Sequence, residues 1–264
     1  MRVKATSKSG NTIKDFITTR IVLFMVITFF FTIILAILQE ALTIDYQYIT
    51  LPQWGPGIAA LLLGFTLYKN TLNESLKIKG IKTYKLVVST LLPFGLIAVS
   101  FVFFNTYHLS AFNLETIEST FFYIIIPATL FGAIGEALGW RVFLQSSISR
   151  RFNHTKAAVL VGILWGLWHV GHYANGFVFM IFFLIFTISF SLVISFLIRV
   201  HTYNLVYASA FHFGANLGFY IFFRSHVNDT SMIIINAVIW LLGAIFVLLM
   251  DKKLLNLTHA DKGI

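Results

Sequence analysis

Long runs of apolar residues, separated by short polar and basic segments, occupy most of the chain from residue 21 onward. A helix needs about 20 mostly apolar residues to cross the hydrocarbon core of a bilayer. Eight segments approach or reach that length, although the second and fifth are short and the fourth is long. The predicted spans are Ile21–Leu38, Trp54–Tyr68, Leu86–Phe104, Phe121–Ser147, Ala157–His172, Phe177–Ile198, Asn204–Phe223 and Met232–Met250.

These segments predict an all-α fold, a polytopic membrane helix bundle of about eight transmembrane helices. Backbone groups in lipid must find their hydrogen bonds within the protein, which favours helices. The sequence contains no internal repeat and no polar segment long enough to fold alone. We predict one structural domain in three parts: residues 1–119 with three spans, 120–223 with the polar motifs described below, and 224–264 with the last span and a cytoplasmic tail.

The loop charges predict the orientation of the bundle. If the N-terminus is cytoplasmic, 17 of the 19 Lys and Arg residues fall in cytoplasmic segments. Of the other two, Arg224 lies in an outside loop and Arg141 lies within the fourth span. Cytoplasmic loops of membrane proteins carry such an excess of basic residues, so we predict that both termini are cytoplasmic. The predicted outside loops instead carry Glu40, Asp45, Glu115, Glu118 and Asp229.

The composition supports a membrane location. Hydrophobic residues make up 58% of the 264 positions and charged residues 11%, whereas soluble domains have about 45–50% and about 25%. The net charge of +9 is explained by the cytoplasmic loops, so we expect the lipid bilayer and no nucleic acid as a partner. The absence of Cys excludes cysteine catalysis and thiolate metal sites. The abundance of Phe, Ile, Asn and Lys suggests an AT-rich bacterium, so we expect the membrane to be a bacterial plasma membrane.

Three spans carry polar residues at membrane depth, where each ionisable group costs free energy and is a candidate for function. The fourth span contains Glu136 and Arg141, the fifth contains His169, and the seventh contains His212 and Asn216. Counted from the cytoplasmic ends, Glu136, both His residues and Asn216 lie roughly 12–18 Å deep at 1.5 Å per residue. A lone buried His or Trp often serves packing alone, but four polar groups at one depth predict a catalytic or transport site.

A buried carboxylate beside a neutral imidazole can hold and deprotonate a water molecule. A second His and an amide can donate to a developing oxyanion. These groups suffice for hydrolysis of an amide bond without a cofactor. A zinc ion bound by Glu136, His169 and His212 is the alternative, although the chain has no HExxH motif.

The three motifs resemble those of the CPBP family of intramembrane proteases, which includes CAAX proteases and bacteriocin-processing (Abi) proteins. That family has EExxxR on one helix, FxxxH on the next and HxxxN on a later one. The resemblance covers about residues 120–223, with Trp140 and Trp165 in the characteristic surroundings of the motifs. The matching residues in this sequence are Glu136 to Arg141, Trp165 to His169, and His212 to Asn216, with Trp165 in place of the family's Phe.

The resemblance implies an intramembrane endopeptidase that cleaves a membrane-associated protein or peptide, such as a CAAX-like, bacteriocin or signal-peptide precursor. It implies that Glu136 is the general base and that His169 positions the water. It further implies that His212 and Asn216 stabilise the oxyanion.

One departure from the family pattern is Ala137, which replaces the second Glu of the first motif. On an α-helix, residue 137 lies four positions before Arg141, which is the ideal spacing for a pair. Glu136 would lie about 140° around the helix from Arg141. We therefore expect Arg141 to find another partner or to extend toward the cytoplasm.

Three functions stay open at this point. Ala137 is compatible with an active protease and also with a catalytically impaired family member that acts as a membrane scaffold or as an immunity or regulatory protein. A proton-coupled transporter is the third possibility, but the sequence shows no inverted repeat and no pair of broken helices.

Overall fold

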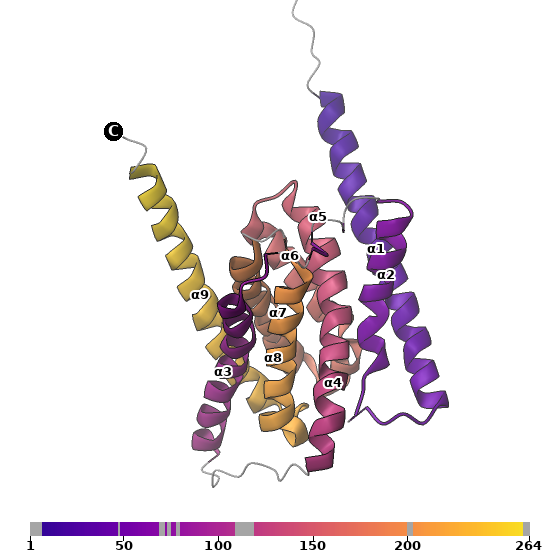
Figure 1. The fold of residues 1–264 in the computed structure, drawn as a ribbon, viewed down its shortest axis with the longest axis vertical. Coiled ribbons are helices and arrows are strands. Elements are labelled where there is room, and N and C mark those ends of the chain that lie inside the picture. Colours follow the sequence, from indigo (N-terminus) through magenta and orange to yellow (C-terminus); the bar gives the residue numbers. More distant parts are fainter. Residues whose placement is uncertain are drawn as a thin grey trace, which may run out of the picture.

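A computed structural model describes residues 7–46, 48–68, 72, 75–77, 80–108, 119–199 and 203–260. Within these residues the chain forms helices and no β-strand, and the helices lie side by side as a bundle (Figure 1). The predicted all-α membrane fold is confirmed. The helices are α1 (Ser7–Ala41), α2 (Gly55–Phe65), α3 (Thr83–Tyr107), α4 (Ser119–Glu136), α5 (Ser146–Ser149), α6 (His154–Trp168), α7 (Phe177–Ile198), α8 (Leu205–Phe223) and α9 (Thr230–Ala260).

Six helices in the described part of the chain are long and apolar enough to cross a membrane. Together they make this chain a multi-pass membrane protein. The second and fifth predicted spans correspond to α2 and α6, which have only 11 and 15 residues. The count of eight spans and the cytoplasmic position of both termini remain predictions. The six long segments are Thr18–Ala41, Thr83–Tyr107, Phe122–Ser149, Phe177–Ile198, Leu205–His226 and Thr230–Asp251.

Short irregular helices explain why α2 and α6 are short. The 3-10 helix η1 (Leu51–Trp54) precedes α2, and the 3-10 helix η3 (Val170–Asn175) follows α6. The predicted fifth span extended to His172, whereas α6 ends at Trp168. A further 3-10 helix, η5 (Arg224–His226), follows α8. All three irregular segments lie at the same end of the bundle. The C-terminal ends of α2, α5 and α7 lie at the opposite end.

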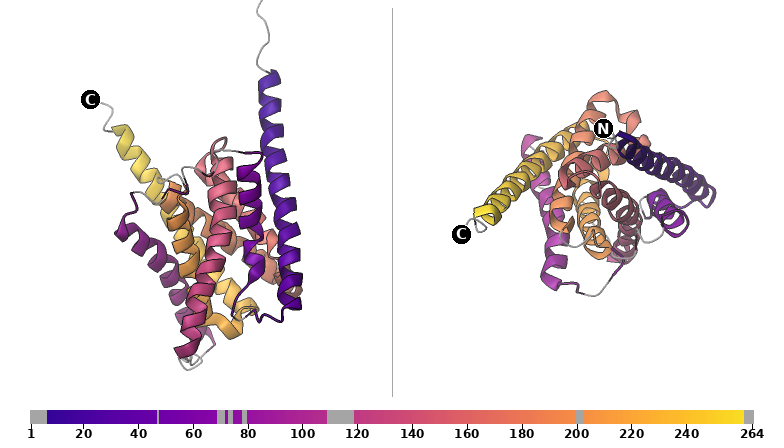
Figure 2. Two further views of the ribbon diagram at one scale, coloured as in Figure 1. Left: turned by 45° about the vertical axis from the view of Figure 1, so that its right-hand side comes forward. Right: turned by 90° about the horizontal axis from the view of Figure 1, so that it is seen from above.

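The helices pack in pairs, with α3 along α8, α7 against α6 and α9, and α1 against α2. Helices α1 and α9 lie at the periphery, as the view from above shows (Figure 2). One face of α1 is an exposed apolar stripe with the three-to-four-residue spacing of a helix surface, and we assign this stripe to contact with lipid. Its members are Val22, Val26, Phe30, Ile33 and Ile37.

Two glycines permit close contacts between helices. A Cβ on Gly139 would lie 2.4 Å from a side-chain atom of Pro56 in α2. A Cβ on Gly214 would lie 2.0 Å from the carbonyl oxygen of Thr90 in α3. Both distances are shorter than real carbon contacts, so the approach of these helices requires glycine, as in other membrane bundles.

The fourth span contains a local change of helix type. After α4 ends at Glu136, residues Ala137–Gln145 form the π-helix η2, and α5 follows directly. All nine residues of η2 are buried. Because hydrogen bonds in a π-helix join residues five positions apart, η2 changes which side chains share a face.

Candidate active site

Glu136, at the end of α4, accepts hydrogen bonds at both carboxylate oxygens. Gln53 of η1 donates its Nε2 to Oε1 at 2.8 Å, and Trp165 of α6 donates its indole Nε1 to Oε2 at 2.8 Å. The side chain is buried, with 3% of the residue exposed. Two neutral donors from separate elements therefore hold the carboxylate in one orientation.

His169 is the first residue beyond α6, and the end of this helix determines the position of its ring. The last carbonyl groups of a helix lack partners within the helix. The backbone N–H of His169 donates to Gly166, which leaves the carbonyl of Trp165 to pair with the imidazole Nδ1 at 2.8 Å. Since a carbonyl only accepts, Nδ1 carries the hydrogen, and Nε2 of the neutral ring is an acceptor.

His212 of α8 lies between the first motif's carboxylate and its arginine. Arg141 donates its Nε to His212 Nε2 at 3.3 Å, and His212 Nδ1 lies 3.9 Å from Glu136 Oε2. Because Nε2 accepts from the guanidinium, the neutral ring carries its hydrogen on Nδ1, on the side of the carboxylate. Arg141, His212 and Glu136 therefore form a polar row. His212, in the middle of this row, is 1% exposed.

Arg141 is fully buried and does not extend toward the end of the bundle. Its Nη1 donates to Ser191 at 2.9 Å and to Gln145 at 3.3 Å, and its guanidinium carbon lies 5.0 Å from the centre of the Trp165 ring. Of the two outcomes that we expected for Arg141, the structure therefore shows the first: the side chain has found other partners and does not extend toward the end of the bundle. One guanidinium nitrogen, Nη2, has no hydrogen-bond partner among the residues that the structure describes.

The α-helical geometry assumed for the first motif is wrong, and the π-helix is the reason. Glu136 directly precedes η2, and Arg141 lies five residues later within it. Residues five apart lie near one another in a π-helix, so Glu136 and Arg141 do not point in opposite directions. Both reach the same His212 ring. Ala137 is fully buried among apolar residues and takes no part in this polar row.

A cavity of about 760 Å³ begins at Glu136 and extends to the end of the bundle where η1, η3 and η5 lie. This volume is in the range of sites for small ligands, about 300–1,000 Å³. Trp165, His169 and Asn216 also line the cavity, whereas His212 and Arg141 do not. Much of the remaining wall is aromatic and comes from α7 and α8: Phe179, Phe183, Phe186, Phe190 and Phe219.

Gln53 and His172 also line the cavity, although neither is among the predicted site residues. Gln53 lies in a short segment before the second predicted span and belongs to none of the three motifs, so only the fold places it beside Glu136. His172 lines the cavity, and its ring stacks on that of His169 with the centres 5.8 Å apart. Trp140 is fully buried against Phe24 and Trp168 and does not line the cavity, so packing explains it.

The residues of the zinc alternative do not fit a metal ion. Among the residues that the structure describes, no three His, Cys, Asp or Glu side chains are grouped as ligands, and this includes Glu136, His169 and His212. The Nε2 of His212 already accepts a hydrogen bond from the guanidinium of Arg141. The guanidinium of Arg141 beside His212 would also repel a divalent cation.

Comparison with known proteins identifies relatives of this region. Residues 117–218, which carry all three motifs, match the family model for Rce1-like proteins, described as type II CAAX prenyl endopeptidase Rce1-like. The resemblance to the CPBP family is confirmed. The match supports the interpretation as a membrane protease.

Two curated relatives match most of the chain. Lysostaphin resistance protein A of Staphylococcus epidermidis is 26% identical over 235 residues, which cover 86% of this chain and 60% of the relative. Lysostaphin resistance protein A of Staphylococcus aureus strain Newman is 26% identical over 228 residues, which cover 83% of this chain and 53% of the relative. The chain therefore spans little more than half the length of these relatives.

Proposed function

We propose that this protein is an intramembrane endopeptidase that hydrolyses a peptide bond in a membrane-associated protein or peptide. The observation that carries the proposal is the position of Glu136 on the wall of the cavity, oriented by Gln53 and Trp165. A carboxylate held in this way, with His169 on the same wall, can take a proton from a water molecule that attacks a carbonyl.

Glu136 is the general base, and the acceptor nitrogen of His169 binds and orients the attacking water. Asn216 lines the same cavity and supplies an amide N–H for the developing oxyanion. His212 is placed behind the wall, between Arg141 and Glu136. We assign it to positioning the carboxylate, instead of the direct contact with the oxyanion that the resemblance implies.

The test of this mechanism is the Glu136→Gln variant, which keeps the shape and removes the base. Purified protein in lipid vesicles is given a library of quenched fluorescent peptides, each anchored by an acyl chain, and cleavage is measured. General-base catalysis is worth about 10²–10⁴-fold in rate, so Glu136→Gln is expected to lose at least a hundredfold. Equal rates for both proteins would refute the mechanism.

A second candidate is a catalytically impaired family member that acts as a scaffold or as an immunity or resistance protein. Ala137 in the first motif and the names of the staphylococcal relatives favour it. Against impairment, Arg141 has bonds to Gln145, Ser191 and His212 in place of a Glu at position 137. The loss of the second Glu therefore does not leave the arginine without partners.

A complementation experiment separates the two candidates. Wild-type protein and Glu136→Gln are expressed at matched levels in a Staphylococcus strain that lacks lysostaphin resistance protein A, and survival in lysostaphin is measured. Where wild type restores survival, the two candidates predict different results for the variant. The protease candidate predicts that Glu136→Gln does not restore survival, and the scaffold candidate predicts that it restores survival equally. Immunoblots of the membrane fraction confirm that both proteins are present.

A further inference from the structure

A second, smaller cavity lies at the opposite end of the bundle from the opening of the candidate active site. It has a volume of about 300 Å³ and is formed by Arg20 and Ile21 of α1 and by the segment from the end of η2 to the residues after α5. Seven residues line it: Arg20, Ile21, Leu144, Ser147, Ile148, Arg150 and Arg151. None of these seven is acidic, and three are arginines.

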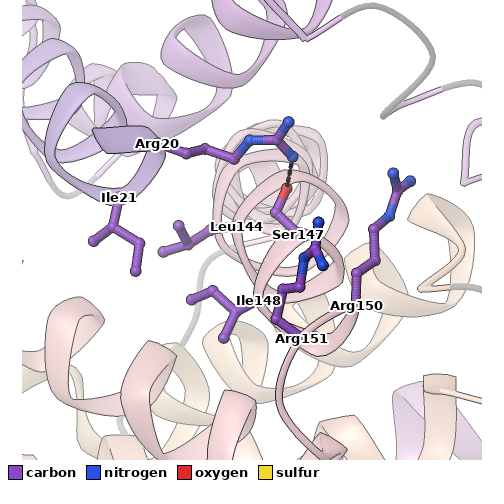
Figure 3. Close-up of a pocket in the computed structure, with 7 residues that line it drawn as sticks. All are labelled: Arg20, Ile21, Leu144, Ser147, Ile148, Arg150 and Arg151. Carbon is purple, nitrogen blue, oxygen red and sulfur yellow. Dashed lines mark hydrogen bonds between the residues drawn. The ribbon is translucent and has the colours of Figure 1, made fainter. Parts of the chain in front are cut away.

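The polar side of this cavity presents three guanidinium groups and one hydroxyl (Figure 3). Arg20 is held in place, because its Nη1 donates to Ser147 Oγ at 2.9 Å and its guanidinium lies 3.8 Å from the centre of the Tyr68 ring. Arg150 and Arg151 are exposed at the rim. One guanidinium can donate two parallel hydrogen bonds to the oxygens of a phosphate, so a cluster of arginines is suited to binding a phosphate group.

The other side of the cavity is apolar. Ile21, Leu144 and Ile148 lie together, apart from the three guanidinium groups (Figure 3). The next residue of α1, Val22, is 52% exposed and belongs to the apolar stripe that we assign to lipid. A free phosphate ion would make no use of these apolar side chains, whereas the glycerol and first acyl carbons of a phospholipid would bury them.

The depth of the cavity also fits a phospholipid. Arg20 lies two residues inside the span that begins at Thr18, and Ser147 lies two residues before the end of the span at Ser149. The cavity is therefore at the level where a hydrocarbon core meets its headgroups. Basic pockets between transmembrane helices at this level bind anionic headgroups.

We propose that this cavity is a binding site for the phosphate of an anionic phospholipid, with the three arginines on the phosphate and the apolar side against the acyl chains. A bound lipid joins α1 to the end of η2, the π-helix that follows Glu136. The site is independent of the proposed protease activity.

Lipid binding by the purified full-length protein tests this proposal. Native mass spectrometry in detergent counts retained phosphatidylglycerol and, in a separate arm, phosphatidylcholine. The Arg150→Gln/Arg151→Gln variant changes only exposed side chains. The control is Lys82→Gln/Lys156→Gln, which removes the same charge from exposed residues outside the cavity. Circular dichroism verifies that both variants are folded.

Two arginine contacts at a membrane surface together correspond to about a thirtyfold change in affinity for an anionic lipid. We therefore expect the cavity variant to retain phosphatidylglycerol about thirtyfold more weakly than wild type and the control to retain it normally. An equal loss in both variants would overturn the proposal in favour of general surface charge. Equal retention of phosphatidylcholine by wild type, or displacement of the lipid by millimolar inorganic phosphate, would also overturn it.

Discussion

The two halves of this bundle differ in both packing and charge. The half that contains η1, η3 and η5 encloses the cavity that begins at Glu136. The other half contains η2, whose nine residues are all buried, and ends in arginines around a much smaller cavity. Glu136 is therefore accessible from one end of the molecule, and the opposite end is closed by packed side chains.

The charge difference indicates which end faces which compartment. Arg20, Arg150, Arg151, Lys156 and Arg199 all lie toward the closed end. The positive-inside rule assigns this end to the cytoplasm, so we expect the large cavity to open on the outer side of the membrane. Its substrate would then be an exported or outward-facing peptide segment.

Labelling of single cysteines gives the largest and clearest effect, because the chain contains no natural Cys. Val227→Cys places a thiol at the cavity opening, on a residue that is 41% exposed. We expect a membrane-impermeant maleimide to label it in intact cells. Lys156→Cys, at the closed end, should react only after permeabilisation.

The reverse labelling pattern would contradict this orientation and would make the cavity accessible from the cytoplasm. That outcome would leave the proposed mechanism intact, because cleavage by purified protein does not depend on which way the cavity faces. A Val227→Ser control verifies that labelling requires the introduced thiol.

The sequence predicted the closed end more completely than the open end. The loop charges identified its arginines, and hydropathy identified the long helices. The three motifs identified Glu136, His169, His212 and Asn216, but the separation of these residues into cavity wall and interior depends on η2 and on the end of α6. No periodic pattern signals a π-helix, and an irregular segment such as η1 hides Gln53 from any search for motifs.

Removal of the Gln53 hydrogen bond is the next largest effect that we predict. A hydrogen bond to a charged group is worth about 1.5–3 kcal/mol, which corresponds to roughly ten- to a hundredfold in rate. Gln53→Leu keeps the side-chain size, so we expect a loss in kcat of this magnitude. Thr50→Val, which alters a lining residue of the same segment, is the control and should be nearly neutral.

The Gln53 prediction depends on a positioning role, so kcat and KM must be measured separately. A change confined to KM would show that Gln53 contacts substrate instead of the carboxylate. An unchanged kcat in a folded Gln53→Leu protein would remove η1 from the candidate site.

The close contact between α2 and η2 should appear as a smaller effect on stability. Gly139→Ala forces a Cβ against Pro56, and overpacking typically costs about 1–3 kcal/mol. We expect a lower thermal midpoint in a fixed detergent. Gly95→Ala is the matched control, because a Cβ there meets nothing within 4 Å. Equal midpoints for the two variants would show that this half is less tightly packed than the structure indicates.

The smallest effects that we predict compare two carboxylates, Asp229 just before α9 and Asp251 within it, one toward each half of the bundle. At the open half, Asp229 precedes the helix and accepts from the backbone N–H of Ser231 at 2.8 Å. At the closed half, Asp251 accepts from Arg199 Nη1 at 2.8 Å, with side chains that are 17% and 22% exposed. The first is a helix cap and the second is a partly exposed ion pair.

These two interactions differ in their response to salt. Loss of a capping residue costs about 1 kcal/mol, and an exposed ion pair is worth about 0–1 kcal/mol and is screened by salt. We therefore expect Asp229→Ala to lower the thermal midpoint at every salt concentration. Asp251→Ala should lower it slightly in low salt and not at about 1 M salt, where the Debye length is about 3 Å. A salt-independent loss for Asp251→Ala would mean that the Arg199 pair is shielded from water.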